Sequence, residues 1–293
     1  MNQANESIFN LLERYGLASK KSQEIFSKKT RDNDNLKVYR DKESGVIYID
    51  NFFVGNRVYE KGEYRKKKGD PSYERKIDCD RRFENFKQFF VGKKICDFGC
   101  GDGEFLKKTK NYASFSCGVE IQDNYVNELK NDFEIYNNLS DLNKKMDCFF
   151  LFHSFEHLID PELVLKKIKT KLNDNGKIII EVPHANDILI TLYQSPEFIR
   201  FTLWSQHLIL HTRESLKRIL EGVGFKNIII KGVQRYNFSN HIHWLTKKQA
   251  GGHKNAFSFI NDFDFNKSYE NMLNKIDKTD TLVAIADVFK NDK

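Results

Sequence analysis

Three glycines at alternate positions, Gly99, Gly101 and Gly103, are the part of this 293-residue sequence that points most directly to ligand binding. They follow a short apolar segment at 95–98, and a helical pattern begins directly after them. In a strand, tight glycine turn and helix, a ligand can approach bare backbone and the positive end of the helix. The arrangement therefore predicts a ligand-binding loop at 99–103.

Two acidic residues accompany this loop. Asp97 ends the strand that precedes it, and Glu120 ends the next predicted strand. Rossmann-type folds place an acidic residue about 20 residues beyond the loop, where it hydrogen-bonds the hydroxyls of a ribose. The spacing G-x-G-x-G differs from the G-x-G-x-x-G of dinucleotide-binding folds, which argues against NAD as the ligand.

Strand and helix patterns alternate around the loop and would position these residues. The alternation implies an α/β fold with a mostly parallel, doubly wound sheet, in which ligands bind beyond the carboxyl ends of the strands. A turn is predicted at 173–176, and Thr212 is predicted to cap the last core helix together with Ser215. The predicted strands are 94–99, 115–121, 133–137, 147–152, 177–183, 227–233 and 280–289, and the helices are 103–111, 122–130, one that Pro161 opens, and 213–223.

Three segments of this core resemble a known family. Asp-Phe-Gly-Cys-Gly-Asp-Gly at 97–103 resembles the first motif of class I S-adenosylmethionine (SAM)-dependent methyltransferases. FFLFHSFEHLIDP at 149–161 resembles the segment after the fourth strand of that family, and LKRILEGVGF at 216–225 resembles the helix and turn before the sixth. The resemblance covers residues 80–235. It implies a Rossmann-like sheet of seven strands, with the seventh antiparallel, and SAM as the cofactor.

The resemblance also implies which residues bind SAM. Asp97 is expected near the ammonium group or the loop backbone, Glu120 at the ribose and Asn138 at the adenine ring. On the helix that leads into the first strand, Arg81 or Arg82 is expected at the methionine carboxylate, and because adjacent residues point to different helix faces, at most one should do so. A surface position is an equal alternative for either arginine. The predicted cofactor-binding residues are Asp97, Gly99, Cys100, Gly101, Glu120, Ile121, Asn138, His153 and Arg82.

All eight histidines lie after residue 150. A hydroxyl acceptor needs a base that takes its proton as the methyl group arrives, and histidine is the usual group near neutral pH. The resemblance favours His207, which falls where similar sugar methyltransferases place a histidine near the acceptor. His157 and His184 complete the predicted catalytic set, and a packing or capping role is an equal alternative for His157.

No metal site is predicted. The segment 153–157 resembles the E-x-x-E-H metal-binding pattern of ubiquinone O-methyltransferases, but His153 stands in place of the first glutamate. Some sugar methyltransferases carry a zinc module bound by cysteines ahead of the core. The corresponding segment here lacks those cysteines, so zinc is not expected.

Two segments extend the core. Residues 1–80 form a predicted N-terminal extension, with an amphipathic helix pair at 5–28 and a β-hairpin at 36–60, and the SAM-binding domain is predicted over 81–293. An insertion at 234–278 precedes the last strand. It resembles a segment of methyltransferases of surface-polysaccharide and nucleotide-sugar modification, which implies substrate contacts at Tyr236, Asn240, His241 and His253. A structural insertion whose aromatic residues pack is an equal alternative.

Composition limits the remaining function classes. The net charge of +7 suits an anionic small substrate or a lysine-rich surface. Nucleic-acid binding is not supported, because we see no basic motif interleaved with aromatic residues. The five cysteines form no C-x-x-C pair, which favours reduced cysteines in a cytoplasmic protein. We see no signal peptide and no apolar run near the ~20 residues that a membrane span needs.

The sequence thus predicts a SAM-dependent methyltransferase that acts on a small acceptor. The predicted acceptor is a hydroxyl of a sugar or a nucleotide-linked precursor of a surface polysaccharide. Methyl transfer to carbon or to a phosphate-type oxygen, and a non-catalytic SAM-fold partner protein, are the alternatives. A nucleic-acid or protein methyltransferase ranks lower, because the segment after the fourth strand reads His-Ser-Phe-Glu rather than N-P-P-Y. The oligomeric state stays open.

Overall fold

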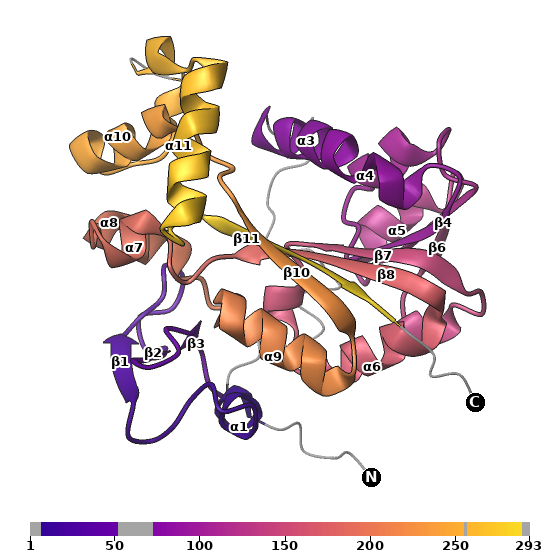
Figure 1. Cartoon of the computed structure of the whole chain (residues 1–293), viewed down its shortest axis with the longest axis horizontal. Coiled ribbons are helices and arrows are strands. Elements are labelled where there is room, and N and C mark those ends of the chain that lie inside the picture. The colour runs from indigo at the N-terminus through magenta and orange to yellow at the C-terminus, as the bar shows by residue number, and fades with distance from the viewer. Residues whose placement is uncertain (1–6, 52–72, 255–256, 289–293) are drawn as a thin grey trace. The chain divides into compact units, whose positions relative to one another are not determined.

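The computed structural model describes residues 7–51, 73–254 and 257–288 (Figure 1). Its backbone contacts divide the chain into two compact units. The first, the extension unit, consists of Met1–Phe52, Val182–Ile219 and Ile230–Val283. The second, the loop unit, consists of Phe53–Glu181, Leu220–Ile229 and Ala284–Lys293 and contains the glycine loop.

A seven-stranded sheet confirms the predicted α/β doubly wound fold. Its strand order is β10-β11-β8-β7-β4-β5-β6, and all but one of the strands run in the same direction. The first strand of the core, β4, therefore lies in the interior of the sheet, and its carboxyl end opens onto the glycine loop. The strands are β4 (Lys94–Phe98), β5 (Phe115–Val119), β6 (Glu134–Tyr136), β7 (Met146–Phe152), β8 (Leu172–Pro183), β10 (Lys226–Val233) and β11 (Thr281–Asp287).

Aromatic packing holds the loop unit together. In β7, Phe149 and Phe150 are fully buried, as expected for a central parallel strand whose two faces are both covered. On one face of the sheet, α3 (Tyr73–Phe90) and α4 (Glu104–Thr109) cover the strands, and α6 (Pro161–Lys171) covers the other (Figure 1). The Phe105 ring of α4 meets the Phe150 ring at a centroid distance of 4.9 Å, and Phe86 of α3 packs on Phe152 at 5.8 Å. This packing fixes α3 and the residues it presents at the carboxyl ends of the strands.

The core elements follow the predicted order with one error. Pro161 opens α6 as predicted, and Asp160 accepts a hydrogen bond from the Leu163 N–H as its N-cap. α5 (Asp123–Leu129) and α9 (Arg213–Val223) are also where we expected them. The predicted turn at 173–176 is wrong, because β8 begins at Leu172 and contains these residues. Asn175 absorbs the irregularity with a φ of 62°, and the register with β7 shifts between Met146 and Cys148.

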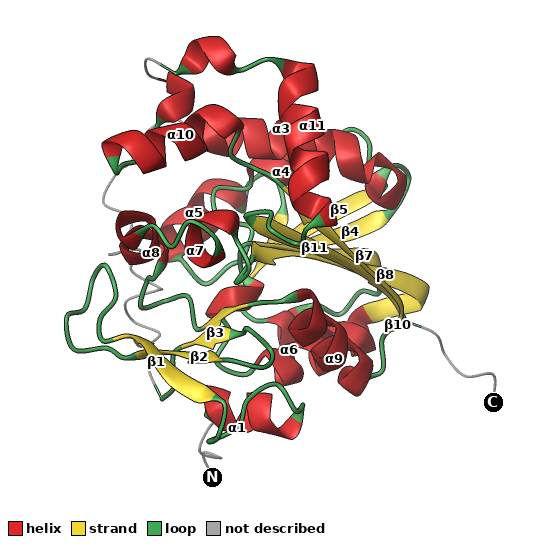
Figure 2. Ribbon diagram, turned by 60° about the vertical axis from the view of Figure 1, so that its left-hand side comes forward, coloured by secondary structure: helices red, strands yellow, loops and turns green. Residues whose placement is uncertain are grey.

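The amino-terminal part of the extension unit is only partly as predicted. α1 (Ile8–Arg14) and the hairpin of β2 (Val38–Asp41) and β3 (Ile47–Tyr48) are confirmed, whereas the end of the predicted hairpin lies outside the described residues. The second predicted helix is wrong, because Gln23–Ser27 form a strand, β1, that pairs with β2. Polar side chains explain the difference: Asp41 accepts hydrogen bonds from the Ser22 hydroxyl and the Ser19 backbone, which fixes a turn ahead of β1. Figure 2 shows α1 beside these strands.

The remainder of the extension unit is mainly helical. β9 (Ile209–Leu210) pairs with β3 and completes a four-stranded sheet. The predicted Thr212 cap is confirmed, since the Thr212 and Ser215 side chains each accept a hydrogen bond from the other's N–H. Among the described residues, no helix has both the length and the apolar character needed to cross a membrane. The helices are α7 (Ile188–Thr191), α8 (Pro196–Thr202), α10 (Phe238–Lys247) and α11 (Phe263–Lys275), and the last two lie side by side in Figures 1 and 2.

Candidate cofactor site and acceptor residues

The glycine loop has the geometry that its sequence predicts. Gly99, Gly101 and Gly103 have φ values of 75°, 55° and 71°, a region in which residues with a Cβ atom are strained. Space also excludes larger residues. A Cβ atom on Gly99 would lie 2.7 Å from Cβ of Ser154, and one on Gly103 would lie 2.6 Å from a methyl group of Leu129. Glycine is therefore required here both by the backbone and by its neighbours.

Glu120 braces this loop. Its Oε2 accepts a hydrogen bond from the Gly101 N–H at 2.8 Å, and its Oε1 accepts two more from the N–H groups of Ile121 and Gln122, at 2.8 and 2.9 Å. A carboxylate has about four acceptor positions, so about one remains for a ribose hydroxyl. Ile121 is 39% exposed beside this acid and offers an apolar surface to a flat ring. The loop and the acid were predicted separately, and the structure joins them by a hydrogen bond.

Asp97 is a buried carboxylate without a hydrogen-bond donor among the described residues. It is only 4% exposed, at the end of β4. Burial raises the pKa of its carboxyl to about 7, against the opposing effect of Arg82 and with further upward contributions from Glu120 and Asp102. Leaving a buried carboxylate without donors is costly. The site therefore fits a ligand that brings a cationic N–H donor, as the ammonium group of SAM does.

Arg82 and Arg81 meet at one acid that the sequence analysis missed. Glu181, at the end of β8, is fully buried, and its Oε1 accepts from Nη2 of Arg81 at 2.8 Å and from Nε and Nη2 of Arg82 at 3.1 and 2.6 Å. Burial alone would raise the pKa of Glu181, but Arg82 and Arg81, with help from His153, hold that pKa well below its usual value. Both arginines reach the same oxygen, so the expectation that their adjacent positions direct them apart is wrong. The signal was a lone acid in the apolar run Ile-Ile-Ile-Glu-Val.

His153 and Ser154 connect this cluster to the glycine loop. The His153 backbone has a φ of 51°, and its ring nitrogens lie 3.2 Å from Oε1 of Glu156 and 3.3 Å from Oε1 of Glu181. The Ser154 hydroxyl donates to the carbonyl of Phe98 at 2.9 Å, directly before the loop. His153 thus lies in the same unit as the loop, and its ring is next to the acid that holds Arg82.

The remaining predicted cofactor residues have local partners. Asn138 is exposed, and its side chain accepts from the Ser140 N–H at 2.9 Å as the cap of a 3-10 turn at Leu139–Asp141. Cys100 is buried, and a Cβ atom on Gly118 would lie 2.6 Å from its sulfur. Burial raises the pKa of its thiol, so it packs as a neutral group.

The model of a family described as a methyltransferase domain matches residues 73–229, more than half of the chain. The chain belongs to this methyltransferase family. Its cofactor is SAM. The glycine loop, Glu120 and the Asp97 carboxylate, which has no donor within the described ranges, are compatible with this cofactor.

Two known proteins show how far this methyltransferase resembles others. A tRNA U34 carboxymethyltransferase from Campylobacter hominis is 25% identical over 214 residues, which cover 65% of this chain and 72% of the relative. The crystal structure of a SAM-dependent methyltransferase from Archaeoglobus fulgidus is similar with a TM-score of 0.52 and 22% identity, over 73% of this chain and 94% of that one. The second likeness supports the fold.

The predicted catalytic histidines of the methyltransferase differ in accessibility. His184 is only 1% exposed, its Nδ1 faces the Thr279 carbonyl at 2.9 Å, and burial lowers its pKa to about 4. His207 is partly exposed, and its Nδ1 lies 3.2 Å from the Thr202 carbonyl. His157, in the loop unit, is also partly exposed. A base must reach its substrate, so His207 and His157 are better placed than His184 to act as one.

The predicted substrate residues of the insertion have extensive bonds inside the extension unit. Asn240 accepts hydrogen bonds from the N–H groups of Gly251 and Gly252, at 2.9 and 3.4 Å. His241 is buried, with Nδ1 at 2.8 Å from the Tyr269 hydroxyl, and burial lowers its pKa to about 4. The pattern Asn-His followed by Gly-Gly-His therefore has a structural explanation in the Asn240 contacts, which is the alternative that the sequence left open.

Tyr236 and His253 are the more accessible members of that set. Both are partly exposed, whereas Asn240 and His241 are buried. The backbone N–H of Tyr236 donates to Oδ2 of Asp280 at 3.0 Å, which fixes the start of the insertion. Substrate contact by any of these four residues stays a prediction.

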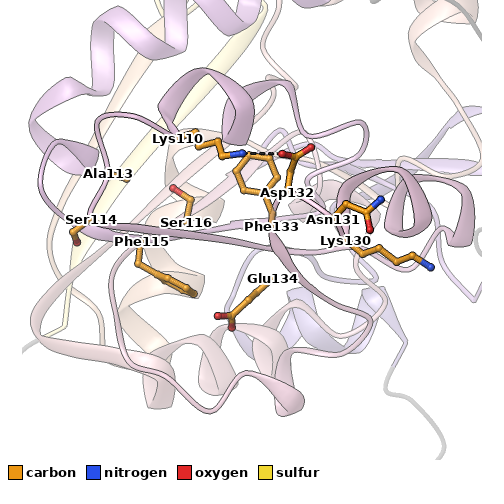
Figure 3. A pocket seen from close by; sticks show the side chains of 10 residues that line it. All are labelled: Lys110, Ala113, Ser114, Phe115, Ser116, Lys130, Asn131, Asp132, Phe133 and Glu134. Atoms are coloured by element: carbon orange, nitrogen blue, oxygen red, sulfur yellow. Dashed lines mark hydrogen bonds and ion pairs between the residues drawn. The ribbon is translucent and has the colours of Figure 1, made fainter.

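One pocket of the loop unit can be set aside. It has a volume of about 400 Å³ and lies at the amino ends of β5 and β6, whereas the glycine loop and Glu120 lie at the carboxyl ends. Figure 3 shows Lys110 of this pocket paired with Asp132 at 2.8 Å. Ligands of doubly wound sheets bind at the carboxyl ends, so this pocket is not the cofactor site. Its lining residues are Lys110, Ala113, Ser114, Phe115, Ser116, Lys130, Asn131, Asp132, Phe133 and Glu134.

Proposed function

We propose that this methyltransferase transfers the methyl group of SAM to a hydroxyl of a small acceptor, with a sugar-linked acceptor as the first choice. The observation that carries the cofactor half of this proposal is the buried Asp97 carboxylate, which has no donor among the described residues. It lies directly before a loop of three glycines with positive φ. When bound, SAM supplies a methyl group that its sulfonium already activates.

The chain then mainly has to bind, orient and exclude water. Asp97 pairs with the ammonium group, and Arg82 pairs with the carboxylate of the methionine part. Glu120 accepts a hydrogen bond from the ribose while it holds the loop at Gly101. Because the same carboxylate contacts the loop and the sugar, the loop is kept in one conformation around the cofactor.

The proton of the acceptor hydroxyl needs a base, and His207 is our first candidate. The Thr202 carbonyl can only accept a hydrogen bond, so Nδ1 of His207 carries the hydrogen. In the neutral ring this leaves the lone pair on Nε2, the form in which histidine acts as a base. His157 is the second candidate.

An RNA acceptor is the second function that a specific observation favours. The relative from Campylobacter hominis is named as a tRNA U34 carboxymethyltransferase. The net charge of +7 is compatible with either acceptor class. The sugar proposal is supported by the resemblance of the insertion to nucleotide-sugar methyltransferases. Transfer to a carbon or a phosphate-type oxygen belongs to the same class of small acceptor.

A release assay separates these acceptors. Purified protein is incubated with SAM and either a panel of nucleotide sugars or bulk tRNA, and the S-adenosylhomocysteine (SAH) formed is measured. We expect SAH above the acceptor-free background with a nucleotide sugar and none with tRNA. Turnover with tRNA alone would replace the sugar proposal. SAH binding without turnover on any acceptor in the panel would favour a non-catalytic partner protein.

A further inference from the structure

One oxygen of Glu181 accepts hydrogen bonds from three donor atoms of two arginines of the loop unit, and Nε2 of His153 lies beside it. Arg81, Arg82 and His153 all lie within 3.3 Å of its Oε1. The cofactor assignments account for Arg82 but give no reason for a fully buried carboxylate behind it. We infer that Glu181 is a positioning residue for the cofactor, which fixes Arg82 so that the second donor edge of its guanidinium receives the methionine carboxylate of SAM. The inference rests on the proposed use of this site for SAM.

The geometry of the guanidinium explains this arrangement. Arginine has five N–H donors on a rigid plane, which form two edges that can each hold a carboxylate. Glu181 takes the edge of Arg82 that Nε and Nη2 form. The other edge, with Nη1 and the second hydrogen of Nη2, makes no hydrogen bond within the described residues, and the side chain is 15% exposed. One edge is thus anchored and the other is open to a ligand.

Two further contacts restrict Arg82. Its guanidinium carbon lies 4.5 Å from the centroid of the Phe152 ring, close enough for a cation–π contact. Phe152 is also the residue that pairs with Glu181 between β7 and β8. The ring and the acid that hold Arg82 therefore come from neighbouring positions of the sheet, and the guanidinium has little freedom to rotate.

The charges around Arg82 match a zwitterion. Arg82 is close enough to Asp97 to lower the pKa of that carboxyl. Arg82 and Asp97 lie near each other, and each has a hydrogen-bonding side that no described residue uses. Such a pair is complementary to the ammonium and carboxylate groups of one amino acid. Arg81 has a separate partner in Asp78 at 3.2 Å, so Glu181 is not required to neutralise it alone.

Comparing two ligands distinguishes the contribution of the methionine part to binding from that of the rest of the cofactor. SAH carries the ammonium and carboxylate groups, whereas 5′-methylthioadenosine carries the same adenosine without them. Both are titrated by calorimetry into the parent protein and into Glu181→Ala, Glu181→Gln, Arg82→Ala and the double variant Glu181→Ala/Arg82→Ala. Lys87→Ala is the matched control, because Lys87 lies on the same helix but pairs with Glu84 at the surface.

We expect Glu181→Ala to lower the affinity for SAH at least tenfold and the affinity for methylthioadenosine less than twofold. Glu181→Gln keeps an acceptor oxygen and should stay within about threefold of the parent for SAH. In the Arg82→Ala background, Glu181→Ala should have no further effect on SAH, since a residue that acts through Arg82 cannot act without it. Lys87→Ala should bind both ligands like the parent.

Equal losses of affinity for SAH and methylthioadenosine in Glu181→Ala would overturn the inference. So would a double variant in which the binding free-energy effects of Glu181→Ala and Arg82→Ala on SAH add in full. Removal of Glu181 leaves two arginines near a buried site and can prevent folding. If the Glu181→Ala variant does not fold, Arg82→Lys is tested in its place. Lysine keeps the charge but cannot bind Glu181 and a ligand carboxylate on two edges. Arg82→Lys should lower the affinity for SAH about tenfold and leave the affinity for methylthioadenosine unchanged. Unchanged SAH binding would refute the inference. Absence of SAH binding by the parent would instead refute the proposed function.

Discussion

The protonation of Asp97 should make cofactor binding depend on pH. Burial raises the pKa of its carboxyl to about 7, so at pH 6 most of the ligand-free protein carries a neutral Asp97. The ammonium group of SAH interacts with the ionised form. Binding at low pH must therefore first remove a proton, and the apparent dissociation constant of SAH should rise as the pH falls.

The size of the effect follows from the pKa. If only the ionised form binds, the apparent dissociation constant is multiplied by 1 plus the ratio of protonated to ionised Asp97. With a pKa of about 7 this factor is about 11 at pH 6 and about 1.1 at pH 8. We therefore expect a loss of about tenfold in affinity between pH 8 and pH 6.

Calorimetric titrations of the protein with SAH at pH 6, 7 and 8 measure how the apparent dissociation constant depends on pH. Methylthioadenosine, which lacks the ammonium group, should bind with little pH dependence and serves as the ligand control. Asp97→Asn should bind SAH more weakly at pH 8 and show a flat profile. If Asp97→Asn bound SAH with the same pH dependence as the parent, another group would be the one that titrates, and Asp97 would not control binding.

Three further predictions concern the loop and the insertion. Glu120→Gln should lower the affinities for SAH and methylthioadenosine alike by about tenfold or more, because both ligands contain the ribose. A loss of affinity confined to SAH would contradict the placement of Glu120 at the ribose. Gly99→Ala should destabilise the protein by about 1–3 kcal/mol in chemical denaturation, because its φ is 75° and Ser154 leaves no room, and an unchanged midpoint would contradict the geometry. Asn240→Ala should lower stability by about 1–2 kcal/mol through two lost hydrogen bonds without changing SAH affinity; a loss of turnover on the acceptor at unchanged stability would instead give Asn240 a substrate role.

The sequence was sufficient for the parts of the site that depend on backbone geometry. A turn that needs positive φ at Gly99, Gly101 and Gly103 can be recognised from glycine spacing, and the strands around it from apolar runs such as the one in β7. Glu120 could be located because its distance from the loop along the chain is set by one βα unit. The geometry of the glycine loop and the position of Glu120 beside it were therefore predictable.

Residues that act through contacts far apart in the sequence were not predictable in this way. Glu181 meets Arg82, 99 positions earlier, and nothing local to β8 indicates that partner. Ser19, Ser22 and Asp41 fix the turn that makes Gln23–Ser27 a strand, although Ile25 and Phe26 also suit a helix. The apolar pattern predicted the strand that contains Glu181 but gave a helix for Gln23–Ser27, and in both places hydrogen bonds between distant residues decided the outcome.

We propose that the glycine loop binds SAM together with Asp97 and Glu120. Calorimetric titration of the parent protein with SAH, and separately with NAD, is the first experiment to make on this assignment. We expect saturable binding of SAH at one site per chain and no binding of NAD, since the glycine spacing does not suit a dinucleotide. Binding of NAD instead of SAH, or of neither ligand at pH 8, would contradict the claim.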